Sequence, residues 1–360
     1  MDQWITTSEA ARRLGVKRGT LYSYVSRGVL TSVRRPGQQE SLFDRTQVDS
    51  LAAVKHDGRR AGERLLRFRS VATRVSAVRD DRLYLRGRDI ETVCATMSFG
   101  EAARLTLQYD GAVPPAPALD AARIRTVPLE RRIPLAVAEI AARDPCRGER
   151  AEVEARVLAL LPALATVVPE VPLAHPWVDL LATCLIDNGL AASTTAARVA
   201  ASARAGVYDA LLSGLGAMAG HLHGGAPVRA ARLLGAVAAS HGGGAAVDAA
   251  IAEAVSVGGR LHGFGHLIYT GDDPRATVVL DRIRADDPGS PALEAVAALV
   301  DRVHQPVNVD LAGAVVAVAL GLPAHATEVV FQYARIVGMA AHVVEEYDET
   351  PLRWRARGEG

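Results

Sequence analysis

Apolar residues recur at the three- and four-residue spacing of amphipathic helices from Ile90 to the end of the chain. Glycine and proline divide this pattern into pieces of ordinary helix length. The predicted helices include 151–161, 178–185, 191–205, 207–218, 230–239, 246–257 and 292–303. There is neither an internal repeat of about 20–50 residues nor an alternation of strands with helices. We therefore predict an all-α body.

Two shorter patterns precede this body. The runs 71–78 and 83–85 contain β-forming residues and flank the turn-like pair Asp80 and Asp81, so we predict a small hairpin there. Residues 56–66 are charged and contain glycine, which is typical of a linker.

The first 55 residues follow a different pattern. Thr6 or Thr7 can cap a helix that ends at Gly15, because glycine tolerates the left-handed conformation found at helix C-termini. After a short turn, a basic segment begins at Lys17 and places Leu21 on an apolar helical face. A helix, a short glycine-containing turn and a basic helix form the pattern of a helix-turn-helix.

Segments 20–28 and 43–49 resemble the MerR/excisionase type of winged helix-turn-helix domain. Two arginines before a Pro-Gly pair lie between β-prone pieces and are expected at the tip of the wing. The resemblance implies DNA contacts from Lys17, Arg18, Thr20, Tyr22, Arg34 and Arg35. The same fold can serve as a protein–protein or dimer-stabilising module without DNA, and both interpretations stay open at this stage.

Charge also separates the N-terminal segment from the body. The whole chain has a formal net charge of +1. Residues 1–64 carry 12 Lys and Arg against 7 Asp and Glu, whereas the remainder carries 29 against 33. Such asymmetry is typical of a basic binding module joined to a body of another kind.

Composition excludes several classes of protein. Hydrophobic residues make up 49% of the chain and charged residues 22%, so wholesale disorder is excluded. No run approaches the roughly 18 apolar residues of a membrane span, and no signal-peptide pattern follows Met1. We therefore expect a cytoplasmic protein with no membrane partner. Cys94, Cys146 and Cys184 lack the spacing of a disulfide framework or zinc site, so no metal is expected.

Three segments place polar residues among glycines in otherwise apolar sequence: 220–226, 262–276 and 308–310. Glycine beside a histidine leaves the imidazole accessible and lets a ligand approach the backbone closely. Taken singly, each segment is more simply a loop, a turn or a helix cap. Their order along the chain carries more information than any one of them.

In this order the segments resemble the motifs of the citrate synthase family. The matching strings are His223-Gly224-Gly225-Ala226, Gly263-Phe264-Gly265-His266 with Tyr269 and Asp273-Pro274-Arg275-Ala276, Asn308-Val309-Asp310, and the helix from Arg335 to His342. Weaker matches lie at 83–87 and 192–198, and the resemblance runs from about residue 70 to 357 with a shortened stretch at 115–175.

The resemblance implies a body of two helical domains. The large domain would comprise 67–226 and 326–360, and the small domain 227–325. The helix-turn-helix domain at 1–55 and the linker at 56–66 would precede them.

The resemblance also implies the condensation of acetyl-CoA with oxaloacetate to citrate and CoA. The methyl group of a thioester is weakly acidic, so the reaction needs a positioned base and a stabiliser of the enolate oxygen. Asp310 would be the base, His223 would hydrogen-bond the thioester oxygen, and His266 would polarise the ketone and supply its proton. No bound cofactor is implied, because the coenzyme A thioester is a cosubstrate.

Further binding residues follow from the same resemblance. Arginine pairs bidentately with carboxylates, and Arg275 and Arg335 match ligands of the 2-oxo dicarboxylate. Arg353 falls where the family's C-terminal arginine enters the neighbouring subunit's site, which implies a homodimer. Contacts with CoA would come from Gly263, Phe264, Gly265 and Thr270.

The chain departs from the family pattern at several positions. Asn188 stands where the family has a histidine that contacts oxaloacetate, and asparagine cannot carry a positive charge. His221 and His262 replace prolines beside the catalytic loops. Thr270 replaces a lysine and Trp354 a proline. We expect the condensation chemistry to be retained with an altered or relaxed choice of ketoacid, in which Asn188 still binds substrate.

Two alternatives stay open. A 2-methylcitrate synthase would use the same residues with propionyl-CoA. A DNA-binding transcription regulator would use the synthase-like body to sense a metabolite or to dimerise, although a pure sensor has no need of Asp310. The two functions are also compatible within one chain.

Overall fold

The computed structural model describes residues 4–16, 21, 30, 32–33, 41–45, 47–49, 71–144, 146, 150–240, 244–258, 261–266, 268–303 and 305–354 of the 360-residue chain. Contacts between residues divide the chain into two units. The N-terminal unit includes Met1–Val71, and the main unit includes Ala72–Ala254, Leu261–Val300 and Gln305–Gly360.

The N-terminal unit begins with strand β1 (Trp4–Thr6) and helix α1 (Thr7–Leu14). The Thr6 side chain accepts a 3.2 Å hydrogen bond from the backbone N–H of Glu9, and Gly15 ends the helix at a φ of 61°. The predicted helix and both of its ends are confirmed. Its apolar face contributes to a small core made of Ile5, Ala10, Leu14, Leu21, Leu30, Phe43 and Val48.

Two further strands complete the sheet of the N-terminal unit. β2 (Ser32–Val33) and β3 (Leu42–Asp44) pair antiparallel, and β3 lies between β1 and β2. In the sequence these strands flank the predicted wing tip. The residues predicted to contact DNA, Lys17, Arg18, Thr20, Tyr22, Arg34 and Arg35, lie outside the described residues.

The predicted hairpin of the main unit is confirmed, with a shorter first strand. β4 (Ser76–Arg79) pairs with β5 (Arg82–Leu85), and the turn residues Asp80 and Asp81 have φ values of 50° and 58°. Two successive residues at positive φ are typical of the type I′ turn, whose twist matches that of the paired strands. A third strand that the sequence did not predict, β6 (Arg88–Asp89), pairs with β5.

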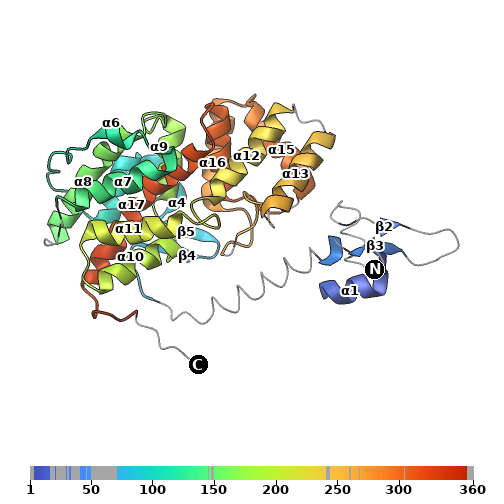
Figure 1. Cartoon of the computed structure of the whole chain (residues 1–360), viewed down its shortest axis with the longest axis horizontal. Helices are drawn as coiled ribbons and strands as arrows, with labels where there is room; N and C mark the ends of the chain where they lie inside the picture. The colour runs from blue at the N-terminus through green and yellow to red at the C-terminus, as the bar shows by residue number, and fades with distance from the viewer. Residues whose placement is uncertain are drawn as a thin grey trace. The chain divides into compact units, whose positions relative to one another are not determined.

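The rest of the main unit is helical, as predicted (Figure 1). Its helices are α4 (Ile90–Thr96), α5 (Phe99–Leu107), α6 (Ala121–Ile124), α7 (Leu129–Ala141), α8 (Arg150–Val167), α9 (Pro176–Leu185), α10 (Ala192–Ser202), α11 (Val207–Met218), α12 (Ala226–Ala239), α13 (Gly244–Gly258), α14 (Pro274–Asp286), α15 (Pro291–Val303), α16 (Val309–Ala319) and α17 (His325–Tyr347). Every helix that the sequence pattern predicts in this unit is present. The basic helix predicted to begin at Lys17 lies mostly outside the described residues, and the linker predicted at 56–66 lies wholly outside them.

Prolines explain the largest differences between predicted and observed helix bounds. α12 begins at Ala226 with Pro227 in its first turn, where proline costs no helical hydrogen bond. α8 continues through Pro162, although the sequence pattern predicts an end before it. Residues beyond this proline, such as Leu164 and Val167, are buried, so packing offsets the lost backbone hydrogen bond.

Helix α17 lies at the centre of the main unit and is buried along most of its length. It packs against α5, α7, α8, α9, α10, α11, α12 and α16, and Figure 1 shows it in red crossing the unit. A Cβ at Gly338 would collide with the carbonyl oxygen of Ile186, which directly follows α9. The absence of a side chain therefore lets α17 touch the segment that carries Asp187 and Asn188.

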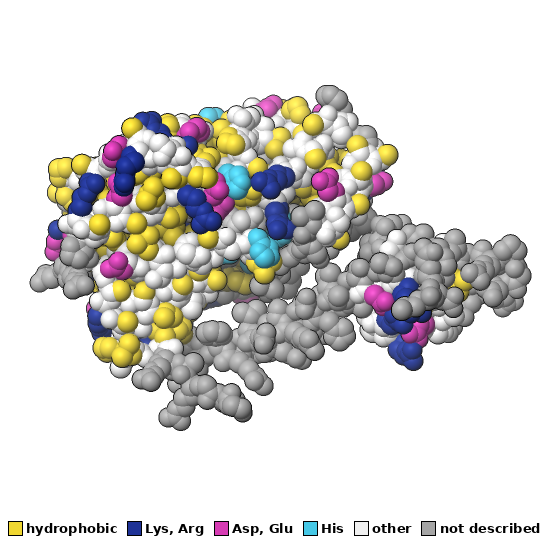
Figure 2. All heavy atoms as spheres, in the orientation of Figure 1, with side chains coloured by type: hydrophobic (Ala, Val, Ile, Leu, Met, Phe, Trp, Pro, Cys, Tyr) yellow, Lys and Arg dark blue, Asp and Glu magenta, His cyan; other side chains and the backbone are white. Residues whose placement is uncertain are grey.

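Helices α14 and α16 bring two distant segments together. α16 packs against α12 and α14, and α14 also packs against α4 and α9. On the face of the main unit seen in Figure 2, basic and acidic side chains are interspersed. In the described part of the chain, no helix has the length and apolar character to cross a membrane.

Candidate active site

The segment before α14 and the segment before α16 are joined by backbone hydrogen bonds. The N–H of Gly265 donates to the carbonyl of Pro306 at 2.7 Å, and the N–H of Asn308 donates to the carbonyl of Gly263 at 3.1 Å. Gly263 and Gly265 have φ values of 96° and 70°, which residues with side chains rarely adopt. This junction places the segment that carries His266 next to the segment that carries Asp310, the predicted base.

Asp310 lies in the first turn of α16. Asn308 caps this helix, and its side-chain oxygen accepts a 3.0 Å hydrogen bond from the N–H of Asp310. The Asn308 side-chain nitrogen donates to the carbonyl of Gly265 at 2.9 Å, so the cap also belongs to the junction. The positive end of the helix dipole favours an anionic carboxylate at this position.

Asp273 links α14 to α16 through a buried ion pair. Its carboxylate accepts bonds of 2.9 Å from Nε and 2.6 Å from Nη2 of Arg275. The same carboxylate accepts a 3.3 Å hydrogen bond from the N–H of Val309. Burial alone would raise the pKa of Asp273 and lower that of Arg275, but their attraction outweighs burial. The pKa of Asp273 is therefore lowered and that of Arg275 raised, so both are charged at neutral pH.

Tyr269 contacts three residues predicted to bind substrate or act in catalysis. Its ring centroid lies 4.5 Å from that of His266, and the guanidinium carbon of Arg275 lies 5.9 Å from the Tyr269 ring. Its hydroxyl donates a 2.8 Å hydrogen bond to Oδ1 of Asn188, which is buried. The pKa of Tyr269 is raised to about 12, mainly by burial, so this hydroxyl is a donor at neutral pH.

The hydrogen bonds of His266 define its tautomer. Nδ1 accepts from the backbone N–H groups of Ile268 at 3.0 Å and Tyr269 at 3.3 Å. A nitrogen that accepts hydrogen bonds carries no proton, so in neutral His266 the hydrogen is on Nε2. This tautomer presents an N–H donor.

His223 lies in the turn between α11 and α12. Its Nε2 is 2.8 Å from the hydroxyl oxygen of Ser193, and its ring packs edge-on against Phe331 with centroids 5.3 Å apart. Burial, and then the positive charge of Arg335, lower the pKa of His223 to about 4. The imidazole is therefore neutral at pH 7.

Arg335 projects from α17 and is buried, with 1% of its surface exposed. Its Nε donates a 3.1 Å hydrogen bond to the carbonyl of Leu185, and its guanidinium carbon lies 4.9 Å from the ring centroid of Phe331. Among the described residues, its Nη1 atom has no hydrogen-bond partner. Burial lowers the pKa of Arg335 to about 10, although Asp187 opposes the shift. A buried cationic nitrogen without a partner is suited to an anionic ligand.

Arg353 joins a different cluster. Its guanidinium makes two 2.7 Å bonds to the Glu346 carboxylate and lies 3.2 Å from that of Glu349. Arg198 donates to the same Glu346 carboxylate at 2.8 Å. The other two predicted substrate-binding arginines contact aromatic rings of the candidate site, Arg275 that of Tyr269 and Arg335 that of Phe331. Among the described residues, Arg353 contacts neither ring.

The residues predicted to contact CoA surround the junction. Gly263 and Gly265 form its backbone bonds, and Phe264 is buried and pairs with Val307 in an isolated bridge. Thr270 is exposed, but its hydroxyl and backbone N–H both donate to the Asp81 carboxylate in the β4–β5 turn. The hydroxyl of Thr270 is thus occupied by the hairpin.

The structure adds Ser193, Phe331, Tyr269 and Asp273 to the set predicted from the sequence. Three of them lie inside or near recognised motifs, and the position of Asp273 before Pro-Arg at a helix start is a detectable cap signal. Phe331 has no such signal, since an aromatic residue on an apolar helix usually indicates core. No group of three or more His, Cys, Asp and Glu side chains among the described residues could hold a metal ion.

Comparison with known families agrees with this geometry. The family model described as the citrate synthase C-terminal domain matches residues 163–357, which is more than half of the chain. The chain therefore belongs to the citrate synthase family. A helix-turn-helix domain model matches residues 4–53.

Curated relatives match the chain over part of its length. A protein named "Putative citrate synthase 2" from Mycobacterium tuberculosis is 35% identical over 171 residues, or 44% of this chain and 44% of that protein. The citrate synthase of Haloferax volcanii is 32% identical over 184 residues, covering 48% of this chain and 47% of that protein. The chain thus spans slightly less than half of these relatives.

Solved structures show the same fold over a longer stretch. The citrate synthase of Thermoplasma acidophilum, solved with carboxymethyl coenzyme A and oxaloacetate, has a TM-score of 0.67 at 20% identity and covers 82% of this chain and 95% of its own. That of Thermotoga maritima has a TM-score of 0.66 at 20% identity, with coverage of 82% and 94%. The predicted all-α, citrate synthase-like fold with large and small helical domains is confirmed.

Proposed function

We propose that this chain condenses acetyl-CoA with oxaloacetate to form citrate and coenzyme A. The observation that supports this most directly is the ion pair of Asp273 and Arg275, which also binds the first N–H of α16. A single carboxylate thereby orders a ketoacid-binding arginine and the helix that bears the base. Membership of the citrate synthase family agrees with this assignment.

The first chemical step is enolisation of the acyl thioester. The Asp310 carboxylate removes a methyl proton while His223 hydrogen-bonds the thioester oxygen. Because His223 is neutral at pH 7, it carries one N–H. In the tautomer proposed for catalysis this hydrogen is on Nδ1, and Nε2 accepts from the Ser193 hydroxyl 2.8 Å away. A positioned base or donor of this kind typically accelerates a reaction by about 10²–10⁴.

The second step forms the carbon–carbon bond. The enolate carbon attacks the ketone carbon of oxaloacetate, and the Nε2–H of His266 donates its proton to the ketone oxygen. Water then cleaves the thioester of the product, which releases citrate and the CoA thiol. The hydrogen bonds to Nδ1 keep His266 in the tautomer that this donation requires.

Arginines provide the carboxylate recognition. Arg335 offers its unpartnered Nη1, and a substrate carboxylate would compensate its buried charge. Arg275, held by Asp273, adds a second cation. Tyr269 connects it to Asn188, since the Tyr269 ring faces the Arg275 guanidinium and its hydroxyl donates to the Asn188 amide. Gly263, Phe264, Gly265 and Thr270 are proposed to line the CoA side of the site.

We further propose that the active form is a homodimer, in which Arg353 contributes to the partner's site. For this, the C-terminal arm must exchange its pair with Glu346 for an intersubunit contact. Size-exclusion chromatography with light scattering tests the dimer. A monomer with full activity would rule it out.

A thiol-release assay tests the reaction. Purified protein is incubated with oxaloacetate and either acetyl-CoA or propionyl-CoA, and free CoA is measured. Asp310→Asn is expected to lower turnover by at least about 10²-fold while the protein stays folded, because the base is lost with little change in shape. Absence of CoA release with both thioesters from folded protein would overturn the proposal. Faster release with propionyl-CoA would instead identify a 2-methylcitrate synthase.

DNA binding by the N-terminal unit is the second candidate function. The helix-turn-helix match over residues 4–53 and the basic charge of the first 64 residues favour it. Salt-dependent binding to a palindromic promoter fragment, weakened by Arg18→Ala and Arg34→Ala, is expected if the module is a regulator. Equal binding by these variants, or none by the parent protein, would exclude specific recognition through the predicted face.

A further inference from the structure

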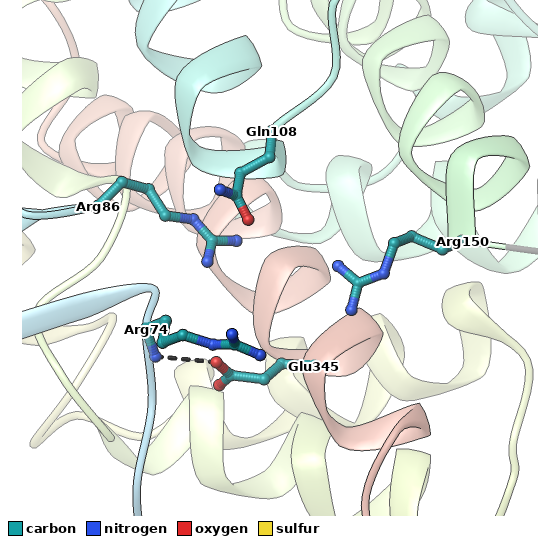
Figure 3. A pocket seen from close by; sticks show the side chains of 5 residues that line it. All are labelled: Arg74, Arg86, Gln108, Arg150 and Glu345. Carbon is teal, nitrogen blue, oxygen red and sulfur yellow. Dashed lines mark hydrogen bonds between the residues drawn. The ribbon is translucent and has the colours of Figure 1, made fainter.

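A cavity of about 250 Å³ lies outside the candidate active site and is lined by Arg74, Arg86, Gln108, Arg150 and Glu345. The residues come from five parts of the main unit. Figure 3 shows the guanidinium groups of Arg86 and Arg150 and the amide of Gln108 extending toward a common space, with Arg74 and Glu345 along its edge. The cavity has three cations against one carboxylate.

The backbone holds two of these arginines at the cavity. Arg86 lies in the β5–β6 turn with a φ of 49°, and its N–H donates to the carbonyl of Val75 at 2.8 Å. Its Nε donates to the carbonyl of Thr106 at 2.8 Å, so the side chain has a defined direction. The N–H of Arg74 donates to Glu345 at 2.8 Å. Hydrogen bonds therefore fix the backbone at Arg74 and Arg86, from which their basic side chains extend.

Nearby carboxylates compensate these charges incompletely. Arg150 pairs with Asp348 at 2.5 Å and with the buried Glu154 at 3.5 Å. Glu345 accepts a 2.7 Å bond from Arg198 as well as the bond from Arg74. Among the ion pairs of the described residues, none involves the side chain of Arg74 or Arg86.

The like charges affect one another. Burial lowers the pKa of Arg86, and the charges of Arg150 and Arg74 add to this effect while Glu345 opposes it. An anion placed among the three guanidinium groups would relieve their repulsion and would accept charge-assisted hydrogen bonds.

We propose that this cavity binds a small polyanion that carries phosphate or carboxylate groups. Its volume is below the range of about 300–1,000 Å³ typical of drug-sized ligands, which favours a compact multivalent anion. Three guanidinium groups and one amide can satisfy several oxygens at once. This binding site goes beyond the proposed condensation and does not depend on it.

Calorimetric titration of the full chain tests the site, with pyrophosphate and tricarballylate as probes at low salt. Arg74→Gln and Arg150→Gln are each expected to weaken binding of the preferred probe about tenfold, the loss of one charge-assisted contact. Arg79→Gln is the matched control, because Arg79 is an exposed arginine on β4 and does not line the cavity. It is expected to change affinity less than twofold.

The two probes distinguish the possible sources of the anion. The comparison uses only the binding that Arg74→Gln or Arg150→Gln weakens, because a polycarboxylate can also bind the proposed active site. Tighter pyrophosphate binding of this kind identifies a phosphate compound, and tighter tricarballylate binding identifies a polycarboxylate. Lack of saturable binding by both probes at millimolar concentration would overturn the proposal. Binding that neither Arg74→Gln nor Arg150→Gln weakens would overturn it too, since the anion would then lie elsewhere. Thermal unfolding of each variant confirms that the protein remains folded.

Discussion

The hydroxyl of Tyr269 donates a 2.8 Å hydrogen bond to Oδ1 of Asn188. The Tyr269 ring also packs against His266, with centroids 4.5 Å apart. Asn188 occupies the position of a family histidine, so the departure from the motif is connected directly to a predicted catalytic residue. Tyr269 occupies one of the two lone pairs of Oδ1, and the amide nitrogen of Asn188 carries two further N–H donors.

Asn188→His is expected to raise the apparent affinity for oxaloacetate several-fold. The imidazole restores a donor that can also become cationic, whereas an amide cannot. Steady-state kinetics with oxaloacetate as the varied substrate measure the effect, and Tyr269→Phe serves as a companion that removes only the hydroxyl. Unchanged or weaker affinity in Asn188→His would show that Asn188 is outside the site or suited to another ketoacid.

Asp273→Asn is expected to destabilise the fold by about 3–5 kcal/mol, because it leaves the buried Arg275 charge without its partner. Asp272→Asn is a matched control. The exposed Asp272 accepts a 2.7 Å hydrogen bond from the N–H of Val307, and an asparagine oxygen can accept the same bond. Urea unfolding compares the two variants. Equal losses of stability would contradict the importance of the ion pair.

Arg335→Met is expected to change the unfolding free energy of the free protein by no more than about 1 kcal/mol, although it removes a buried arginine. The guanidinium that the substitution removes has no hydrogen-bond partner for its Nη1 among the described residues, so little stabilisation is lost with it. Stabilisation by oxaloacetate should disappear, as thermal unfolding with and without the ligand would show.

Arg198→Met is the control for that substitution. Arg198 is equally buried but pairs with Glu345 at 2.7 Å and Glu346 at 2.8 Å. Its loss removes an ion-pair partner from Glu345 and one of the two arginines that pair with the buried Glu346, and we expect a cost of about 3–5 kcal/mol. Similar stability losses in the two variants would contradict the assignment of Arg335 as a ligand-binding cation.

The low pKa of His223 predicts a pH-dependent contribution to stability. In the folded protein its pKa is about 4, whereas an exposed histidine titrates near 6.5. Between these values the unfolded chain binds a proton that the folded chain does not. The contribution of neutral His223 is therefore complete above about pH 6.5 and falls as the pH decreases toward 4.

Urea unfolding of the parent and His223→Asn proteins at several pH values tests this expectation. The parent should lose stability more steeply than the variant between pH 6.5 and 4.5. Parallel losses in the two proteins would show that His223 titrates normally in the folded state.

Local signals explain the parts of the fold that the sequence predicts correctly. A cap at Thr6, a glycine at 15 and the turn at Asp80-Asp81 all act within a few residues, so their effects appear in the sequence. Motif order likewise predicts the family. The sequence pattern does not predict the continuation of α8 through Pro162, because burial of the following turn, a tertiary effect, offsets the local cost of the proline.

Side-chain partners far apart in the chain were not predictable in the same way. Tyr269 and Asn188 are separated by 81 positions, and no periodic pattern indicates which polar groups will meet over such a distance. The pairing of Arg353 with Glu346 is also one of many possible ion pairs. The identities of the residues indicate the chemistry of the site, while the packing of α14, α16 and α17 determines which side chains contact one another.

The contact between Gly338 and Ile186 limits which substitutions the centre of this fold can accept. Any side chain at Gly338 would displace the backbone that carries Asp187 and Asn188, although Gly338 itself lies on another element, α17. If Asn188 binds the ketoacid as proposed, a change of substrate is therefore expected from replacing side chains such as Asn188, which leaves the backbone in place. Gly338→Ala, which adds a single methyl group to α17, would move that backbone and shift both side chains at once.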